Sequence, residues 1–147
     1  MLLIANDPRT GLRRKRGYTL LEMLIVLSII ALIAALVGPR LFAQFDRSKV
    51  TAAHVQAKSL RSALDTMELD IGRYPTQEEG LNLLVQQPAD GVENWHGPYL
   101  SGALPRDPWG HNYFYEAPKD SSQEPQIMSY GADGKPGGTG NDADIVE

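Results

Sequence analysis

The sequence predicts an α+β protein in which one long N-terminal helix packs on a small antiparallel sheet. Three patterns predict this fold: an apolar run over residues 17–39, an amphipathic stripe over 50–71, and two short strand-like segments at 112–116 and 126–130. The chain has 147 residues, which is typical of one modest domain. It contains no cysteine, so disulfides, thiol catalysis and thiolate zinc sites are excluded.

The charge of the chain is divided unevenly between its start and the remainder. The formal net charge is −4, and residues 1–17 alone carry +4 because five basic residues face only Asp7. The rest of the chain therefore carries −8. Such a strongly acidic region repels the phosphate backbone of nucleic acids, so the sequence argues against nucleic-acid binding.

The apolar run is long enough for a transmembrane helix. Glu22 is its one ionisable side chain, and at about 1.5 Å per residue the run spans about 35 Å. A basic cluster at residues 13–16 lies directly before it, which places the N-terminus in the cytoplasm and exports the C-terminal bulk. The cluster could instead be a nucleic-acid or localisation patch, but basic residues that abut an apolar helix usually set orientation.

A secretory signal peptide is the competing interpretation of the same run, with a small-residue cleavage site near Ala34 and Ala35. Glu22 argues against it, because a carboxylate within an apolar span costs a few kcal/mol and usually has a partner and a function. An alternative for Glu22 is that its side chain reaches the lipid headgroups.

The sequence RGYTLLEM at residues 16–23 resembles the processing site of type IV pilins and pseudopilins. The shared pattern is a basic leader, glycine, an aromatic residue and glutamate at the fifth mature position. The resemblance implies that a prepilin peptidase cuts after Gly17 and N-methylates Tyr18. It further implies that Glu22 pairs with the α-amine of Tyr18 of a neighbouring subunit in a polymer. Tyr18 stands where the family usually has phenylalanine, and the 17-residue leader is long for the family.

The amphipathic stripe continues the helix beyond the apolar run. Its apolar positions recur in steps of three and four: Val50, Ala53, Ala57, Leu60, Leu64, Met67 and Ile71. Pro39 is expected to kink or locally melt the helix, Gly72 to cap its C-terminus, and Pro75 to prevent its resumption. The pattern predicts one helix from about Tyr18 to Ile71.

The remainder predicts a small head of short elements. Residues 76–85 predict a short helix, because Thr76 and Glu79 have the spacing of a capping box. Residues 86–106 are rich in proline and glycine and predict a loop. A tight turn at 107–110 then precedes the two strand-like segments.

Further motifs resemble the major pseudopilins of type II secretion systems, the pseudopilin G family. They are RYPT at 73–76, EGL at 79–81, GPYL at 97–100, LP at 104–105, DPWG at 107–110 and SYGADG at 129–134. With the processing site, the match runs from about Arg16 to Ile145. Adhesive type IV pilins typically close their C-terminal region with a disulfide, so the absence of cysteine favours the secretion branch.

The resemblance implies a type IV pilin-like architecture in three parts. These are a basic leader at 1–17 removed by prepilin peptidase, a transmembrane and fibre-core helix at 18–39, and a periplasmic head at 40–147 that includes the second half of the helix. The protein would be a single-pass inner-membrane protein that polymerises into a pseudopilus and drives export of folded proteins. Its implied partners are further copies of itself, minor pseudopilins, and the inner-membrane assembly platform with its ATPase. A type IV pilus-like pilin and a minor pseudopilin are the alternatives.

An acidic, glycine-rich stretch ends the chain. Calcium takes six to eight oxygen ligands at about 2.3–2.6 Å, and glycines let a loop turn its carbonyls inward. The stretch lacks the EF-hand spacing, and composition alone favours a solvated, flexible tail. The family resemblance implies a calcium ion here, bound by the side chains of Asp133, Asp142 and Asp144 and by the main-chain oxygens of Tyr130 and Lys135.

Nothing in the sequence indicates catalysis. His54, His96 and His111 show no metal-ligand spacing, and no GxSxG, P-loop or GxGxxG motif is present. No side chain is nominated as a nucleophile or a general base, so we expect the protein not to be an enzyme.

Overall fold

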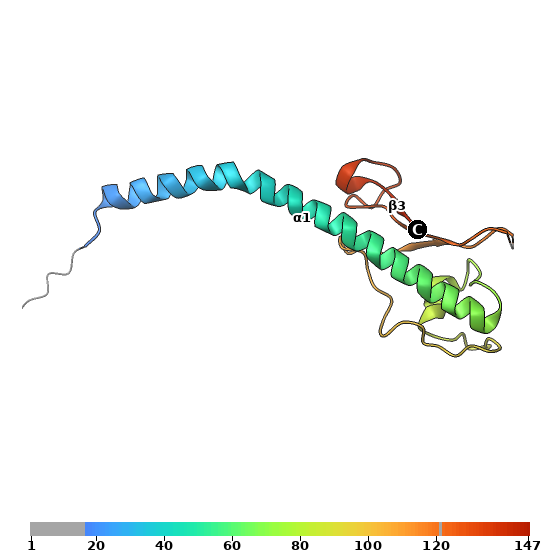
Figure 1. The fold of residues 1–147 in the computed structure, drawn as a ribbon. Coiled ribbons are helices and arrows are strands. Elements are labelled where there is room, and N and C mark those ends of the chain that lie inside the picture. Colours follow the sequence, from blue (N-terminus) through green and yellow to red (C-terminus); the bar gives the residue numbers. More distant parts are fainter. Residues whose placement is uncertain (1–16, 121) are drawn as a thin grey trace, which may run out of the picture. The chain divides into compact units, whose positions relative to one another are not determined.

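The computed structural model describes residues 17–120 and 122–147 (Figure 1). The chain forms two compact units, residues 1–40 and 41–147, and each is described by itself. The elements are α1 (Leu20–Ile71), η1 (Gly80–Leu84), β1 (Phe114–Glu116), β2 (Gln126–Ser129), η2 (Gly140–Asp142) and β3 (Ile145–Val146). The predicted leader, apart from Gly17, lies outside the described residues.

In the first unit, α1 begins with a side-chain cap. Thr19 Oγ1 accepts a hydrogen bond from the Glu22 N–H at 3.1 Å, and Thr19 O accepts one from the Met23 N–H at 3.2 Å. The helix therefore starts at Leu20, two residues later than expected. Its apolar stretch is long enough to cross a membrane, and none of that stretch is buried within the protein.

The helix continues through Gly38 and Pro39 without a break. Of the two expectations for Pro39, local melting is therefore wrong, and the kink stays a prediction. Proline removes a single N–H donor, and the turns on both sides keep their own hydrogen bonds, so the helix tolerates the loss.

In the second unit, one face of α1 forms half of the core. Its buried residues are Ala53, Ala57, Leu60, Ala63, Leu64 and Met67, which confirms the central part of the predicted stripe and adds Ala63. Val50 and Ile71, at the two ends of the stripe, are only half-buried. Gly72 ends the helix in the left-handed region at φ 79°, and its N–H donates to Glu68 O at 2.7 Å. The predicted glycine cap is confirmed.

The capping box after the helix is also present. Thr76 N–H donates to Glu79 Oε2 at 2.8 Å, and Glu79 N–H donates to Thr76 Oγ1 at 3.3 Å. The Arg73 guanidinium binds both carboxylate oxygens of Glu79, at 2.7 and 2.9 Å, and with the Thr76 bonds lowers the pKa of Glu79 to about 2. The segment then enters a 3₁₀ helix, η1, because Gly80 adopts φ 55° and ends the right-handed turn.

The sheet has three antiparallel strands in the order β1-β2-β3. Tyr115 pairs with Ile127, and Ser129 pairs with Ile145. These side chains are buried with Tyr113, and Tyr115 and Ile127 belong to the core cluster that includes the buried face of α1. The two predicted strands are confirmed with shorter bounds, whereas the two-residue strand β3 was missed.

Gln77 covers the free edge of β1. Its side-chain Nε2 donates to Tyr115 O at 2.7 Å, and its Oε1 accepts from the Ala117 N–H at 2.9 Å. The amide thus takes the two hydrogen bonds that a neighbouring strand would otherwise offer. Tyr115 adds a bond from its hydroxyl to Pro75 O at 2.8 Å, which ties the same edge to the turn after α1.

Candidate functional site

The predicted processing site lies at the start of the first unit. Gly17 and Tyr18 precede α1 in an exposed segment without regular secondary structure, and Tyr18 is 78% exposed. Glu22 follows in the first turn of α1 and is also exposed, where its negative charge is favourable to the helix dipole. An uncoiled peptide bond between Gly17 and Tyr18 is accessible to a peptidase, and the Glu22 carboxylate is accessible to a second chain.

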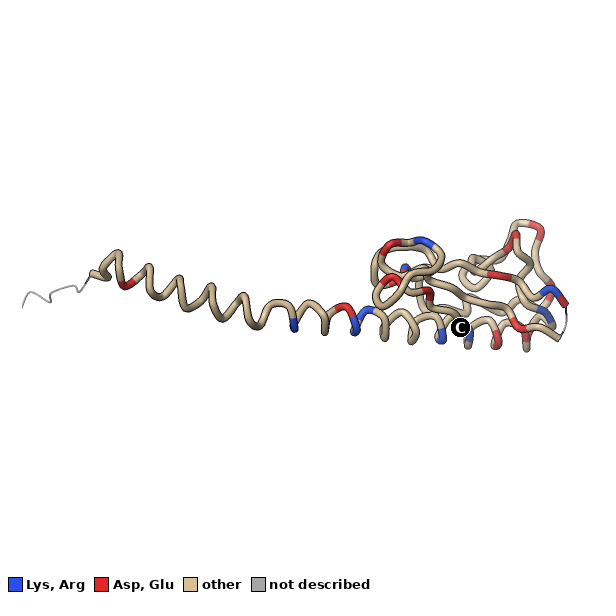
Figure 2. Tube along the Cα trace, turned by 90° about the horizontal axis from the view of Figure 1, so that it is seen from above, with Lys and Arg blue, Asp and Glu red and all other residues tan. Residues whose placement is uncertain are grey.

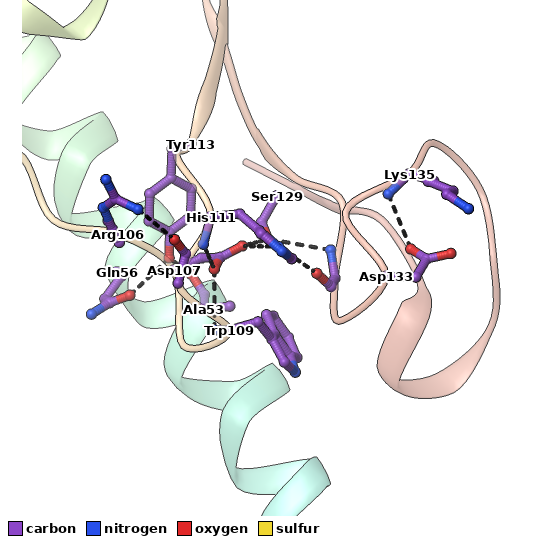
Figure 3. A network of polar contacts seen from close by, with 12 residues as sticks. Ala53, Gln56, Arg106, Asp107, Trp109, His111, Tyr113, Ser129, Asp133 and Lys135 are labelled. Carbon is purple, nitrogen blue, oxygen red and sulfur yellow. Dashed lines mark hydrogen bonds and ion pairs between the residues drawn. The ribbon is translucent and has the colours of Figure 1, made fainter.

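The predicted metal-binding residues lie in the acidic loop, residues 130–144, between β2 and β3. Asp133 Oδ1 accepts a hydrogen bond from the Lys135 N–H at 3.1 Å (Figure 3). Both carboxylate oxygens of Asp144 accept from the Gly137 N–H, at 3.0 and 2.9 Å. The Ala132 N–H donates to Asn141 O at 3.0 Å. The loop is therefore folded back on itself by its own carboxylates and backbone.

The structure does not bring all the predicted ligands together. Within residues 17–120 and 122–147, no three Asp, Glu or His side chains form a group that could hold a metal. Tyr130 is half-buried, and its ring packs on Phe114 with centroids 4.4 Å apart. However, Asn141 Oδ1 is buried in the same loop without a hydrogen-bond partner. A buried, unpaired oxygen in a loop that also carries Asp133, Asp142 and Asp144 suits a hard cation, so the donor chemistry of the loop fits calcium, although the three carboxylates are not gathered around one point.

Two glycines set the close packing of this loop. Gly131 and Gly138 adopt φ 66° and 87°. A Cβ at Gly131 would lie 2.8 Å from Asn141 O, and one at Gly138 would overlap Asp142 O. A side chain at either position would clash with the backbone around Asp142, so the two facing segments of the loop would have to move apart.

A network around the buried side chains of Asp107 and Ser129 positions the start of the loop, and the sequence did not reveal it. We call it the Asp107 latch (Asp107, His111 and Ser129). Asp107 Oδ1 accepts from the N–H groups of Trp109 and His111 at 3.1 and 2.8 Å. Asp107 Oδ2 accepts from Ser129 Oγ at 2.6 Å (Figure 3). His111 Nδ1 lies 3.2 Å from Gly131 O, so the latch joins the turn at 107–110 to the acidic loop.

The bonds that Asp107 makes within its own turn could have been predicted from the sequence. An aspartate that starts a turn often accepts from backbone N–H groups two residues on, and DPWG has this form. Ser129 lies 22 positions away in the chain, and no local pattern connects it to Asp107.

The fold and the N-terminal segment together define a membrane-anchored, single-pass protein of the type IV pilin-like class. Residues 12–38 match the family model described as the prokaryotic N-terminal methylation motif, and residues 40–147 match the model described as type II secretion system (T2SS), protein G. The chain belongs to the type II secretion system protein G family, the major pseudopilins, which are structural subunits. The resemblance of the sequence to the pseudopilin G family is therefore confirmed.

Individual relatives cover most of the chain. The type II secretion system core protein G of Pseudomonas aeruginosa is 41% identical over 90% of this chain and 94% of its own length. The protein of the same name from Vibrio cholerae is 37% identical over 91% of this chain and 92% of its own length. The crystal structure of the major pseudopilin from the type 2 secretion system of enterohaemorrhagic Escherichia coli superimposes with a TM-score of 0.59 at 32% identity, covering 74% of this chain and 93% of that chain.

Proposed function

We propose that this chain is the subunit that polymerises in the periplasm into a pseudopilus, whose growth drives folded proteins across the outer membrane. The observation that carries the proposal is a processing motif that leads directly into an unburied apolar helix, followed by a head that matches protein G over residues 40–147. The match over most of the length of core protein G relatives supports the major subunit over a minor pseudopilin or an adhesive pilin.

The proposed topology has three parts. Residues 1–17 are the cytoplasmic leader removed by prepilin peptidase, residues 18–39 span the inner membrane and later form the fibre core, and residues 40–147 form the periplasmic head. The basic cluster at 13–16 supports this orientation. Minor pseudopilins and the assembly platform with its ATPase are the proposed partners.

N-terminal mass spectrometry tests this proposal directly. In cells that contain the prepilin peptidase, we expect a mature terminus at N-methylated Tyr18, and in cells without it the intact leader. Gly17→Val should block processing, because a β-branched residue crowds the scissile bond, whereas the same change at Gly11 should leave processing intact. A terminus near Leu36, or an uncut Met1 form in both strains, would contradict the proposal.

Within the fibre, we propose that Glu22 of one subunit pairs with the methylated α-amine of Tyr18 of its neighbour. Tyr18 lies just before α1 and Glu22 lies in its first turn, and both residues are exposed, which supports contact with a second chain. A charge buried in an apolar fibre core is costly unless it is paired, so the pair would also fix the axial register of the subunits.

We further propose that the acidic loop binds one calcium ion through the side chains of Asp133, Asp142 and Asp144. Main-chain oxygens of Tyr130 and Lys135 would complete the ligand set. The unpaired Asn141 Oδ1 and the tight glycines of the loop support a site for a hard cation. The ion would neutralise the carboxylates and hold the loop closed.

Calcium should therefore raise the melting temperature of the head. At a free concentration about 100 times Kd, binding adds about 2.7 kcal/mol, which corresponds to roughly 10 °C for a domain of this size. The measurement is near-UV circular dichroism of the full chain in detergent, with calcium, with magnesium and with excess chelator. Asp142→Asn should remove the calcium response, whereas Glu93→Gln, an exposed change outside the loop, should keep it. Identical melts with calcium and with chelator would exclude the site.

A further inference from the structure

The turns of α1 that follow its apolar, membrane-spanning stretch carry solvent-exposed apolar side chains. We call residues 41–49 of α1 the collar. In the collar, Leu41, Phe42 and Phe45 are 51%, 72% and 65% exposed, although the buried face of the helix begins at Ala53. The head therefore covers α1 only beyond the collar, and two phenylalanine rings lie on a helix surface that the second unit leaves uncovered.

The collar is also locally basic within an acidic unit. Arg47 and Lys49 are exposed there and outnumber Asp46, whereas the second unit as a whole is strongly acidic. In Figure 2 both signs of charge occur along α1, and most of the negative residues of this unit lie in the segments that follow the helix. A short basic stretch thus precedes an acidic head.

The position of the collar along the helix limits what can cover it. At about 1.5 Å per residue, the collar occupies roughly the first 14 Å past the end of the span. The headgroup layer is about 5–8 Å thick on each side of the hydrocarbon, and charges act over about 8–10 Å at physiological salt. With the apolar stretch of α1 placed across a bilayer, the phenylalanines would lie at headgroup level, and the basic side chains would lie within reach of the lipid phosphates.

We propose that the collar binds the anionic phospholipid headgroups of the leaflet from which the span emerges. Phe42 and Phe45 occupy the interface, as aromatic residues do at the ends of transmembrane helices. Arg47 and Lys49 interact with lipid phosphates, and the acidic remainder of the head is repelled from the same surface. The subunit is thereby held with its head away from the bilayer before it enters a fibre.

The proposal rests on the membrane anchoring of the proposed function, and two features favour lipid over a second copy of the chain. The collar continues the same helix that forms the span, so in the unassembled subunit the membrane surface is its nearest neighbour. Its combination of aromatic and basic side chains also matches the chemistry of an anionic bilayer surface.

Spin-label accessibility in nanodiscs tests the proposal, since the chain has no cysteine to replace. One label at Gln44→Cys, an exposed collar position, reports the depth of the collar. A second label at Ile25→Cys, within the span, reports anchoring itself. The full chain is placed at one copy per disc in phosphatidylcholine alone and in phosphatidylcholine with phosphatidylglycerol, at low salt and at about 1 M salt, where screening shortens the range of charges to about 3 Å.

We expect the label at Gln44 to lie deeper in the anionic discs than in the neutral ones, and to lose this difference at high salt. Arg47→Gln with Lys49→Gln should abolish the difference, and Lys49→Gln alone should reduce it. Lys58→Gln removes another exposed charge about 14 Å farther along the helix than Lys49, so it should leave the difference unchanged.

Equal depth in neutral and anionic discs, with Ile25 deep in both, would overturn the collar proposal and leave the anchoring intact. A shallow label at Ile25 would refute the anchoring and the collar proposal with it. Protection of the label at Gln44 only in discs that hold two or more chains would assign the collar to a second copy and likewise overturn lipid binding.

Discussion

Glu22→Ala should reduce assembled fibres by about a hundredfold or more while leaving membrane insertion and leader cleavage intact. In the proposed fibre core, the Tyr18 α-amine of each neighbouring subunit would then be buried without a partner. Removing one member of a buried ion pair costs about 3–5 kcal/mol, and every subunit contact in the polymer would lose this amount. The monomer would lose nothing comparable, because Glu22 is exposed in the single chain.

The measurement is the yield of sheared, sedimented fibres, with the mature N-terminus checked by mass spectrometry in the same cells. Glu22→Asp keeps the charge on a shorter side chain and should retain more fibres than Glu22→Ala. Thr19→Ala removes the helix cap beside Glu22 without changing any charge, and should cost only about 1 kcal/mol of helix stability. Normal fibre yield from Glu22→Ala would exclude the proposed pair.

Asp107→Ala should lower the stability of the head by about 3 kcal/mol or more. The substitution leaves the N–H groups of Trp109 and His111 and the buried hydroxyl of Ser129 without their acceptor. Each unsatisfied buried group costs about 1–3 kcal/mol. For a domain of this size the loss corresponds to a decrease in Tm of about 12 °C or more.

Near-UV circular dichroism of the full chain in detergent measures this decrease, because both tryptophans of the chain, Trp95 and Trp109, belong to the head. Asp107→Asn retains an oxygen acceptor of the same shape and should lose less. Asp90→Ala removes an exposed carboxylate and should stay within about 0.5 kcal/mol of the parent. A melt of Asp107→Ala that coincides with that of Asp90→Ala would show that the latch contributes nothing to stability.

The elements that could be predicted are those whose signals are local. The stripe that contains Leu60 and Leu64 has helical spacing, and Gly72 stands where a left-handed cap is needed. Thr76 and Glu79 are three residues apart, as a capping box requires. In each case the interacting groups lie within a few residues of one another, so the pattern alone predicts the contact.

The features that were missed depend on contacts between distant parts of the chain. The strand β3 has two residues and forms only because β2 is already in place beside it. Ser129 binds Asp107 across 22 positions, and the burial of Asn141 Oδ1 depends on how the acidic loop closes. A single sequence carries no record of such pairings, so the ligand residues of the loop stay a proposal.

The amide of Gln77 on the edge of β1 has a consequence for how copies of this chain can join. An open strand edge invites another strand to extend the sheet, and polymers built in that way are very hard to take apart. With the Tyr115 carbonyl and the Ala117 N–H already bound, this edge offers no such template. We therefore expect the subunits of the proposed fibre not to join by extending the sheet at the β1 edge, and to be held on this side by side-chain contacts.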